Sequence, residues 1–187
     1  MLIGYALCGS YCTFERSLDE LRRLVTAGYQ LQPIMSENAY TTDTRFGKAS
    51  DFESELTKLC GRPVIHTIRD AEPLGPKLKL DLLAISPCTG NTLAKLACGV
   101  TDTAVTMAAK AHLRSDRPLV IALASNDAMS ANLANLGRLL NRKNVYFVPL
   151  RQDDPEWKPH SLVAEFERLG ETIDAAFEGK QLRPLFI

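Results

Sequence analysis

Short apolar runs alternate along the chain with segments whose apolar residues recur at helical spacing. An apolar run of four to eight residues bounded by turn-forming residues is typical of a buried strand, and a longer segment with a period of 3.6 residues is typical of a helix. The pattern predicts strands at 2–8, 29–35, 64–68, 82–85, 119–124 and 145–148. It predicts helices at 13–27, in a segment that ends near Cys60, from about Thr89 onward, and at 103–113, 128–140 and 162–177.

Strands that alternate with helices predict an α/β protein with a three-layer, Rossmann-like fold, in which helices cover both faces of a parallel sheet. The chain has 187 residues, which is long enough for one substantial core. We therefore expect a single domain over 1–187. Polar or proline-rich segments at 36–47, 72–77 and 155–159 are expected to be loops.

The segment 81–102 carries the strongest functional signal. Its apolar strand breaks at Ser86-Pro87, and a helical pattern starts a few residues later. A helix that starts directly after a strand presents free N–H groups, and its dipole favours a bound anion. The same residues allow a simpler interpretation, in which Thr89 or Asn91 only caps the helix. The small and polar residues at this junction are Thr89, Gly90, Asn91 and Thr92.

Small polar residues also follow three other predicted strands. In an open α/β sheet, ligands bind beyond the carboxyl ends of the strands. Turns favour such residues, so one loop alone means little, but all of them together favour a nucleotide or flavin site. The spacing of Gly4 and Gly9 fits neither a Walker A motif nor G-x-G-x-x-G. The four loops are Gly9-Ser10, Ser36-Glu37-Asn38, Thr89 to Thr92, and Ser125-Asn126-Asp127.

Charge and composition exclude several classes of partner. The chain carries 22 basic and 22 acidic side chains, and the basic group at Arg138, Arg142 and Lys143 fits the solvated end of a helix. We therefore expect no nucleic-acid partner. No apolar run approaches the roughly 20 residues of a membrane span, and the first residues lack the basic start of a signal peptide, so we expect no membrane partner.

The cysteines give no sign of a metal site. The chain has five of them, without a C-x-x-C pair or a Cys/His metal spacing. This pattern predicts free thiols in a reducing cytoplasm and no bound metal.

The segment Ser86-Pro-Cys-Thr-Gly-Asn-Thr-Leu-Ala-Lys-Leu-Ala-Cys-Gly-Val-Thr-Asp102 resembles a motif of one flavoprotein superfamily. That superfamily contains the FMN-dependent cysteine decarboxylases and the flavin prenyltransferases. Its members hold the flavin phosphate in a Pro-Ala-Ser-Ala-Asn-Thr-like loop. The resemblance implies that the chain binds FMN, or phosphate only. The residues implied are Gly9, Ser10, Ser36, Ser86, Thr89, Gly90, Asn91, Thr92, Ser125 and Asn126.

Further segments resemble one branch of that superfamily, the B subunits of dipicolinate synthases. This resemblance implies an oxidoreductase component that acts with an NADP-binding A subunit. The pair would convert the dihydrodipicolinate-type lysine-pathway intermediate to dipicolinic acid during sporulation, in the cytoplasm of the mother cell. It also implies a homo-oligomer. The segments include Gly9-Ser-Tyr-Cys-Thr13, Thr44-Arg-Phe-Gly47, Ala71-Glu-Pro-Leu-Gly-Pro-Lys77, Asn126-Asp-Ala128 and Gln152-Asp-Asp-Pro155.

Two departures from the wider superfamily argue against decarboxylation of a cysteinyl peptide. The decarboxylases carry a catalytic histidine shortly before the strand that leads to the phosphate loop, where this chain has Pro73-Leu-Gly-Pro76. Their Pro-x-Met-Asn-x-x-Met-Trp clamp corresponds to Ser125-Asn-Asp-Ala-Met-Ser-Ala-Asn132 here. His66, His112 and His160 are expected to be packing or surface residues. A decarboxylase-like or prenyltransferase-like flavoprotein remains the alternative.

A small dicarboxylate substrate requires cations, and arginine suits a carboxylate because its guanidinium binds it with two hydrogen bonds. Arg45 is the best candidate, since the neighbouring Gly47 suggests a loop of defined shape; Lys77 and Lys110 are further candidates. Asp127 would orient the substrate or act as a base, although an Asx turn explains it equally well. No acid/base pair is evident, so the catalytic residues stay unassigned, and a non-catalytic partner with a vestigial flavin site is the second hypothesis.

Overall fold

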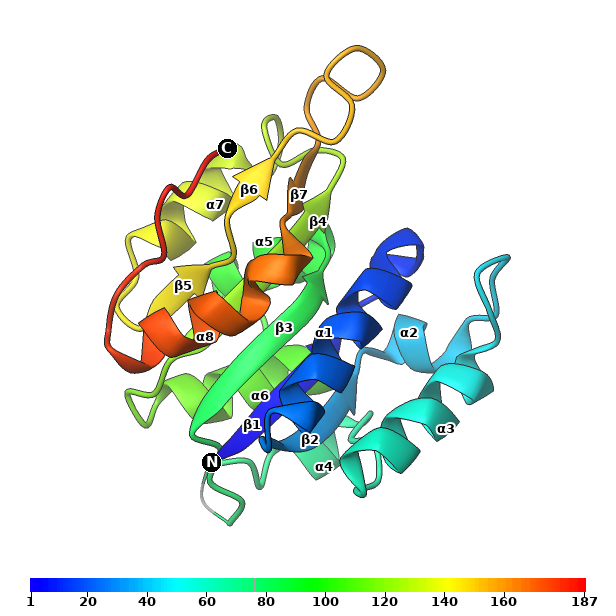
Figure 1. Ribbon diagram of the computed structural model, residues 1–187. Coiled ribbons are helices and arrows are strands. Elements are labelled where there is room, and N and C mark those ends of the chain that lie inside the picture. The colour runs from blue at the N-terminus through cyan, green and yellow to red at the C-terminus, as the bar shows by residue number, and fades with distance from the viewer. Residues whose placement is uncertain (76) are drawn as a thin grey trace.

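The computed structural model describes residues 1–75 and 77–187, which form one seven-stranded sheet between helices (Figure 1). The sheet has the order β2-β1-β3-β4-β7-β6, and β5 also pairs with β4. Strands β1 to β5 pair in parallel, whereas β7 pairs antiparallel with both β4 and β6. The strands are β1 (Leu2–Leu7), β2 (Gln30–Met35), β3 (Leu82–Cys88), β4 (Leu119–Ser125), β5 (Val145–Phe147), β6 (Leu150–Arg151) and β7 (Leu162–Ala164).

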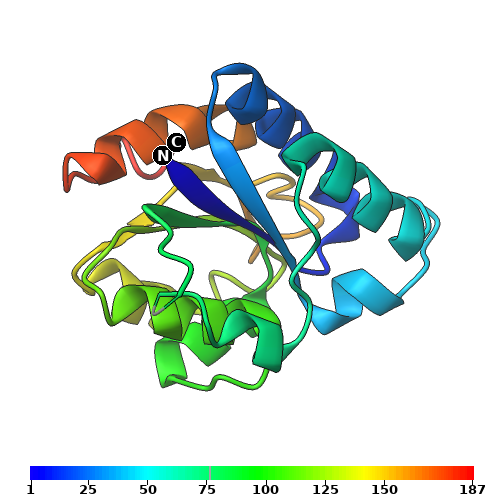
Figure 2. The same ribbon diagram turned by 90° about the horizontal axis from the view of Figure 1, so that it is seen from below.

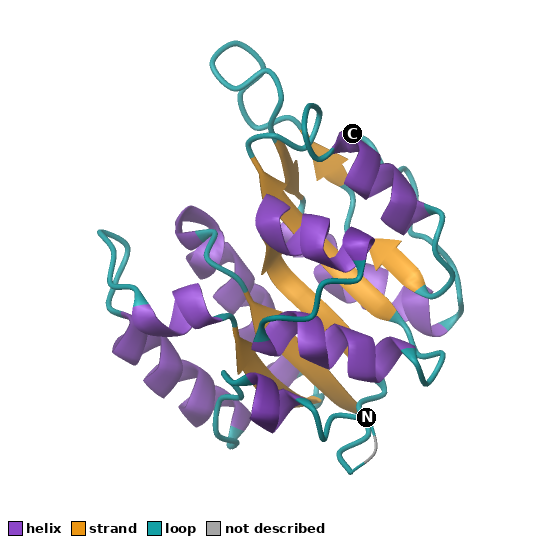
Figure 3. Cartoon of the chain, turned by 180° about the vertical axis from the view of Figure 1, so that it is seen from behind, coloured by secondary structure: helices purple, strands orange, loops and turns teal. Residues whose placement is uncertain are grey.

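Helices cover both faces of the sheet, as the predicted three-layer fold requires (Figures 2 and 3). Helices α1 and α8 pack on one face, with α3 beside α1 near the β2 edge. Helices α5, α6 and α7 pack on the other, and α4 contacts α6. The helices are α1 (Phe14–Thr26), α2 (Glu37–Thr41), α3 (Ala49–Cys60), α4 (Ile68–Ala71), α5 (Gly90–Cys98), α6 (Ala104–Leu113), α7 (Leu133–Leu140) and α8 (Leu169–Phe177), with short 3-10 turns η1 (Tyr11–Thr13) and η2 (Phe166–Arg168).

The central strands are buried from end to end, which explains why they read as continuous apolar runs in the sequence. All seven residues of β3 and all seven of β4 are buried. Parallel strands that are covered on both faces cannot alternate between apolar and polar residues. The core therefore lies directly on both sides of β1, β3 and β4.

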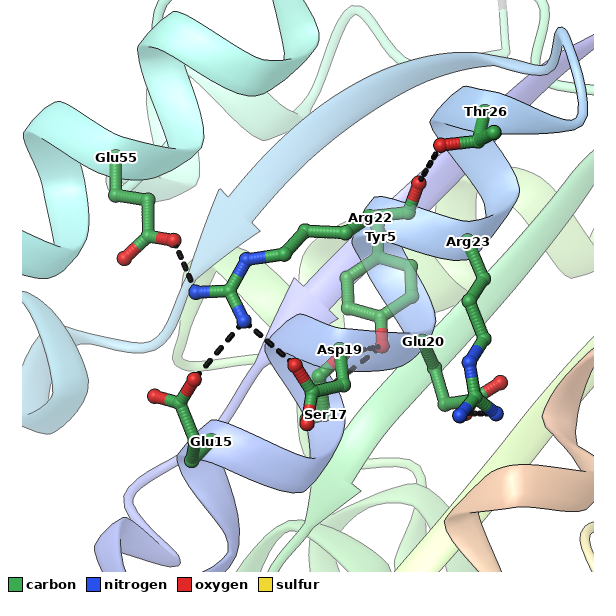
Figure 4. Close-up of polar contacts among 9 residues, drawn as sticks. All are labelled: Tyr5, Glu15, Ser17, Asp19, Glu20, Arg22, Arg23, Thr26 and Glu55. Carbon is green, nitrogen blue, oxygen red and sulfur yellow. Dashed lines mark hydrogen bonds and ion pairs between the residues drawn. The ribbon is translucent and has the colours of Figure 1, made fainter.

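Polar contacts hold α1 against the sheet and against α3 (Figure 4). The Tyr5 hydroxyl donates to the Ser17 carbonyl at 2.7 Å, and the Ser17 hydroxyl donates to the Ser86 carbonyl at 2.6 Å. At the surface, the Arg22 guanidinium contacts Glu15 and Asp19 of its own helix and Glu55 of α3. These contacts fix the segment that follows β1, which forms one wall of the cleft described below.

The structure corrects four predicted elements. The expected loop at 36–47 contains α2, because the Ser36 side chain accepts a hydrogen bond from the Ala39 N–H and caps that helix. The expected strand at 64–68 is reduced to a single bridge between Ile65 and Ile34. The expected helix 128–140 begins only at Leu133.

The expected helix 162–177 starts as strand β7, whose three residues are all buried, and becomes helical only after Glu165. Strand β6, which pairs with it, was not predicted. Pro76, the last residue of the segment that replaces the decarboxylase histidine, lies outside the described residues.

Candidate functional site

A cavity of about 800 Å³ lies beyond the carboxyl ends of the parallel strands. We call it the strand-end cleft. Residues of three of the four predicted loops, those after β1, β3 and β4, line it. Two further loops also contribute, one between α2 and α3 and one between β6 and β7, and both project away from the sheet (Figure 1). Its lining residues include Gly9, Ser10, Cys12, Arg16, Arg45, Phe46, Thr89, Gly90, Asn91, Ser125, Asn126, Asp127, Asp153, Lys158 and Val163.

The first turn of α5 presents two backbone donors at this cleft. Thr89 is the N-cap, and its side chain accepts a hydrogen bond from the Thr92 N–H at 3.2 Å. Within the described chain, the N–H groups of Gly90 and Asn91 have no hydrogen-bond acceptor. The helix has nine residues, so its dipole adds to these free donors and favours an anion at this end. Thr89 therefore caps the helix, and two backbone donors stay free beside the cap.

Gly90 serves a different purpose from the one its sequence context suggests. The sequence suggests that a glycine here lets a ligand approach the backbone, but the chain itself fills this space. A Cβ atom on Gly90 would lie 2.3 Å from the Ser125 Oγ and 2.8 Å from both Asn132 Nδ2 and Asp127 Oδ1. Gly90 therefore allows the loop after β4 to pack against the start of α5.

Asp127 is held as a carboxylate by its own loop. Its Oδ atoms accept a hydrogen bond from the Ser125 hydroxyl and two from the Asn132 amide at 3.0 Å. The Ser125 hydrogen bond, followed by those from Asn132, lowers the pKa of Asp127 below the ordinary aspartate value. This arrangement suits a group that orients Ser125 and Asn132, because both carboxylate oxygens are already engaged.

A smaller cavity of about 260 Å³ lies on the Thr92 side of the same helix start. Gly9, Thr89 and Asn91 line both it and the strand-end cleft, so the two are neighbouring parts of one site. The smaller cavity is polar, and Lys95 forms an ion pair with Asp102 at 2.8 Å at its wall. Its other lining residues are Ser36, Glu37, Asn38, Thr92 and Thr103.

The loop after β1 is held by hydrogen bonds at the point where it meets the cleft. The Thr13 hydroxyl lies 2.8 Å from the Ser10 carbonyl and 3.1 Å from the Ser10 hydroxyl. The Tyr11 hydroxyl donates to the Asn38 carbonyl at 2.7 Å, which ties the loop after β1 to α2. Ser10 lines the strand-end cleft together with Thr89 and Gly90 at the start of α5.

Arg45 lies at the cleft on a loop of defined shape. Thr44 and Gly47 exchange two backbone hydrogen bonds, at 3.0 and 3.1 Å. Gly47 has φ +149°, and a Cβ atom there would lie 2.8 Å from the Phe52 ring. The Arg45 guanidinium lies 4.8 Å from the centre of the Phe46 ring. The sequence argument for a structured loop around Gly47 therefore agrees with the structure.

Three predicted site residues lie away from the cleft. Ser86 is fully buried beneath α1 and bonds to Ser17, so its side chain does not reach a ligand. Lys77 precedes β3 and therefore lies near the amino-terminal ends of the parallel strands, away from the cleft at their carboxyl ends. Lys110 lies in the last turn of α6 and lines a different cavity.

Sequence reasoning missed several cleft residues. Arg16 lines the cleft from the first turn of α1 and pairs with Glu167 at 3.1 Å. Lys158 reaches it from the loop between β6 and β7, where it pairs with Asp153 at 2.9 Å. Arg16 could have been found from its position just after the first strand-end loop. Lys158 could not have been found, because its loop is positioned by β6 and β7, which the sequence does not predict.

The histidines and cysteines give no sign of a separate catalytic centre. His66 stacks on Tyr40 with ring centres 3.7 Å apart, and His112 is buried with Nε2 2.9 Å from the Pro118 carbonyl oxygen. Burial lowers the pKa of His112 and raises the pKa of Cys8 to about 11. All five cysteines are free thiols, and no cluster of metal-ligating side chains occurs among the described residues.

Comparison with known proteins identifies the family. The flavoprotein family model matches residues 2–175. The B subunit of dipicolinate synthase from Bacillus subtilis (strain 168) is 43% identical over 185 residues, which is 99% of this chain and 92% of that protein. The crystal structure of the dipicolinate synthase B subunit from Bacillus halodurans superposes with a TM-score of 0.91 at 42% identity and covers 100% of this chain and 95% of that one.

A more distant likeness shows the fold alone. A dodecameric FMN-dependent UbiX-like decarboxylase from Escherichia coli O157:H7 superposes with a TM-score of 0.61 at 22% identity, over 80% of each chain.

The chain belongs to the flavoprotein family and, within it, to the dipicolinate synthase B subunits. No helix in 1–75 or 77–187 has the length and apolar character needed to cross a bilayer.

Proposed function

We propose that this flavoprotein-family chain is the B subunit of a dipicolinate synthase, active with an NADP-binding A subunit in the cytoplasm of a sporulating mother cell. The observation that carries the proposal is the strand-end cleft, in a chain 43% identical over 99% of its length to a protein of that name. The cleft combines free backbone donors at the start of α5 with the side chains of Arg16, Arg45 and Lys158.

The proposed reaction removes a hydride and a proton from a dihydropyridine ring that carries two carboxylates. One C–H bond breaks with its electron pair, which leaves as hydride to NADP on the A subunit, and the proton is released as the ring becomes aromatic. The B subunit must hold the two carboxylates while the hydride and the proton leave. A site that binds dianions needs cations and oriented N–H donors, and both line this cleft.

The cleft also fits a flavin phosphate. The smaller cavity at the start of α5 is lined by Asn91, whose backbone N–H is free, and by the hydroxyl residues Ser36 and Thr92. On the other side, the Asp127 carboxylate would repel a phosphate, so we place the phosphate on the Thr92 side. FMN bound there would supply a two-electron acceptor next to the larger cleft.

The chain's own residues have separate roles in this proposal. Arg45 binds a substrate carboxylate, and its hydrogen-bonded loop sets the direction of approach. Asp127 acts as a positioning residue that holds Ser125 and Asn132 against the start of α5. Arg16 and Lys158 are already paired with Glu167 and Asp153, so they contribute less net positive charge than Arg45.

A second function is a non-catalytic B subunit that binds only phosphate and shapes the A subunit. The engagement of both Asp127 oxygens favours it, because the cleft then lacks a free general base among the described residues. Purified protein separates the two functions by its absorbance: a bound flavin gives a yellow protein, whereas a phosphate-only site gives a colourless one that still activates the A subunit.

We also propose a homo-oligomer. The support is the dodecameric state of the UbiX-like decarboxylase that shares the fold. The small residues of α6 would suit packing on a neighbour, but Ala104, Val105, Ala108 and Ala109 are buried within this chain, so they do not carry the proposal. Light scattering at micromolar concentration tests the claim, and a clean monomer would contradict it.

The function is tested by measuring oxidation of the dihydropyridine intermediate with the A subunit alone, this chain alone, and both. The proposal predicts that dipicolinate forms at the full rate only when both are present. Equal rates with and without this chain would overturn it. Flavin analysis of the same preparation shows whether FMN contributes to that rate.

A further inference from the structure

A second cavity of about 340 Å³ is lined by residues of α5 and α6 and of the segment that follows α7. Helices α5 and α6 lie on the face of the sheet opposite to α1 and α8 (Figure 2). We call this second cavity the α5–α6 cavity. Leu96, Ala109 and Leu113 are among its lining residues, and we call these three apolar residues its floor. Leu96 and Ala109 are buried, so this floor belongs to the fixed core. The volume is at the lower end of the range of small-molecule sites.

The walls of this cavity are strongly basic. Lys95, Lys110, Arg114 and Arg142 line it, and none of the described residues that line it is acidic. Lys95 is neutralised by Asp102 at 2.8 Å. In the part of the chain that the structure describes, the side chains of the other three cations have no ion pair or hydrogen bond. Three uncompensated positive charges therefore surround one apolar pocket.

The sequence separates these cations into two groups that each look like an ordinary solvated surface. Lys110 and Arg114 lie one turn apart at the end of α6, and Arg142 follows α7. Only the packing of α5 against both α6 and α7 brings them to one cavity. The strand-end cleft differs in kind, because Arg16 and Lys158 there are paired with carboxylates.

We propose that the α5–α6 cavity binds a small dianion with an apolar body, of the class of aromatic dicarboxylates. The three free cations match two negative charges, and guanidinium groups bind carboxylates with two hydrogen bonds. The floor of Leu96, Ala109 and Leu113 matches a hydrocarbon ring. This site is separate from the strand-end cleft and does not depend on the function proposed for that cleft.

The test is calorimetric titration of the full chain with phthalate and, separately, with inorganic phosphate. Phthalate should bind saturably and more tightly than inorganic phosphate, because only phthalate uses the apolar floor. The double substitution Arg114→Gln/Arg142→Gln should weaken phthalate binding about tenfold or more, since both charged contacts are lost. Both substituted side chains are exposed, so folding should be unaffected.

Two variants serve as matched controls. Lys143→Gln removes the neighbouring cation, which pairs with Asp116 at 4.0 Å and does not line the cavity. Arg69→Ala removes a cation whose side chain is 93% exposed and does not line the cavity. Both should leave the phthalate affinity within about twofold of the wild type, because a solvated charge that does not touch the ligand is largely screened.

Several results would overturn the proposal. These are the lack of saturable binding, phthalate binding that the Arg114→Gln/Arg142→Gln variant retains in full, an equal effect of Lys143→Gln, a loss of binding caused by Arg69→Ala, or phosphate binding as tight as that of phthalate. Light scattering on the same samples covers one further case. If the Arg114→Gln/Arg142→Gln variant changes the oligomeric state while phthalate does not bind, a second copy of the chain covers this face and the small-molecule site is refuted.

Discussion

A single glycine decides how the two central loops of the site meet. Gly90 starts α5, and the side chains of Ser125, Asp127 and Asn132 occupy the space where its Cβ would stand. Close packing of this kind leaves no room for one extra methyl group. The start of α5 and the loop after β4 are therefore one unit, and a change in either should alter both.

Gly90→Ala should destabilise the protein by about 1–3 kcal/mol, because the new methyl group overlaps the Ser125 hydroxyl. Urea unfolding measures the effect. Gly137→Ala is the matched control: Gly137 lies within α7 with no atom within 4 Å of its Cβ position. It should stabilise the protein by about 0.5–1 kcal/mol. Equal effects of the two variants would refute the close packing at Gly90.

The lowered pKa of Asp127 makes a prediction about acid stability. A carboxylate whose pKa is lower in the folded state stabilises the fold above the ordinary aspartate pKa of about 3.9, and this contribution is lost as the pH falls through the folded-state pKa. Asp127→Asn should therefore lower the free energy of unfolding most near neutral pH, and the difference from wild type should shrink below about pH 4.

Unfolding measured from about pH 7 to about pH 3 checks this, with Glu156→Gln as an exposed control. A difference between wild type and Asp127→Asn that stays constant over this range would contradict the assigned hydrogen bonds.

Arg45→Ala should lower kcat/KM of the two-subunit reaction about ten- to hundredfold, since losing a hydrogen bond to a charged group costs about 1.5–3 kcal/mol. Arg45→Lys should recover only part of the loss, because an ammonium cannot make the paired contact. Arg69→Ala, with a side chain that is 93% exposed and lies outside the cleft, is the control. Unchanged kinetics in both Arg45 variants would place the carboxylate clamp elsewhere.

At the scale of elements, the hydrophobic pattern predicts the helices and strands that lie in the core. It fails where contacts with distant segments determine whether a residue run forms a helix or a strand. The pattern agrees with strands β1 to β4 and with helices α1, α3, α5 and α6. A strand buried on both faces is a continuous apolar run, and a helix buried on one face has apolar residues at helical spacing, so both can be recognised from the sequence. The segment 162–164 was predicted as helix, since a run of three apolar residues fits either state. Its pairing with Ala124 and Ser125 makes it a strand.

The same reasoning explains what could be predicted of the site. The loops after β1, β3 and β4 were found because parallel strands bring their carboxyl ends together. Ser86 was misplaced because β3 continues to Cys88, which carries Ser86 into the core. Lys158 was missed because its position depends on β6 and β7, which are two and three residues long.

Helix α6 offers a test of local sequence against tertiary packing. Thr103 and Thr106 form a capping box, in which each side chain accepts a hydrogen bond from the other residue's N–H. Thr103→Ala should cost about 1 kcal/mol of stability, whereas Thr103→Ser should stay near wild type. Thermal unfolding measures both variants. No loss in the alanine variant would mean that packing alone fixes the start of α6.

At the scale of the whole molecule, two anion-favouring regions differ in character. The strand-end cleft lies at the carboxyl ends of the strands and mixes cations with Asp127 and Asp153. The α5–α6 cavity lies on one face and carries only cations among its charged lining residues that the structure describes. Helix α5 links them, because its first turn lines the cleft and Lys95 and Leu96 line the cavity.

We propose that this chain makes dipicolinate synthesis possible through its strand-end cleft. The most direct measurement is the rate of dipicolinate formation by the A subunit, followed by ultraviolet absorbance, with wild-type chain, with Arg45→Ala and without the chain. We expect a full rate with wild type, a rate about ten- to hundredfold lower with Arg45→Ala at limiting substrate, and the lowest rate with the A subunit alone. A rate that is the same in all three mixtures would contradict it.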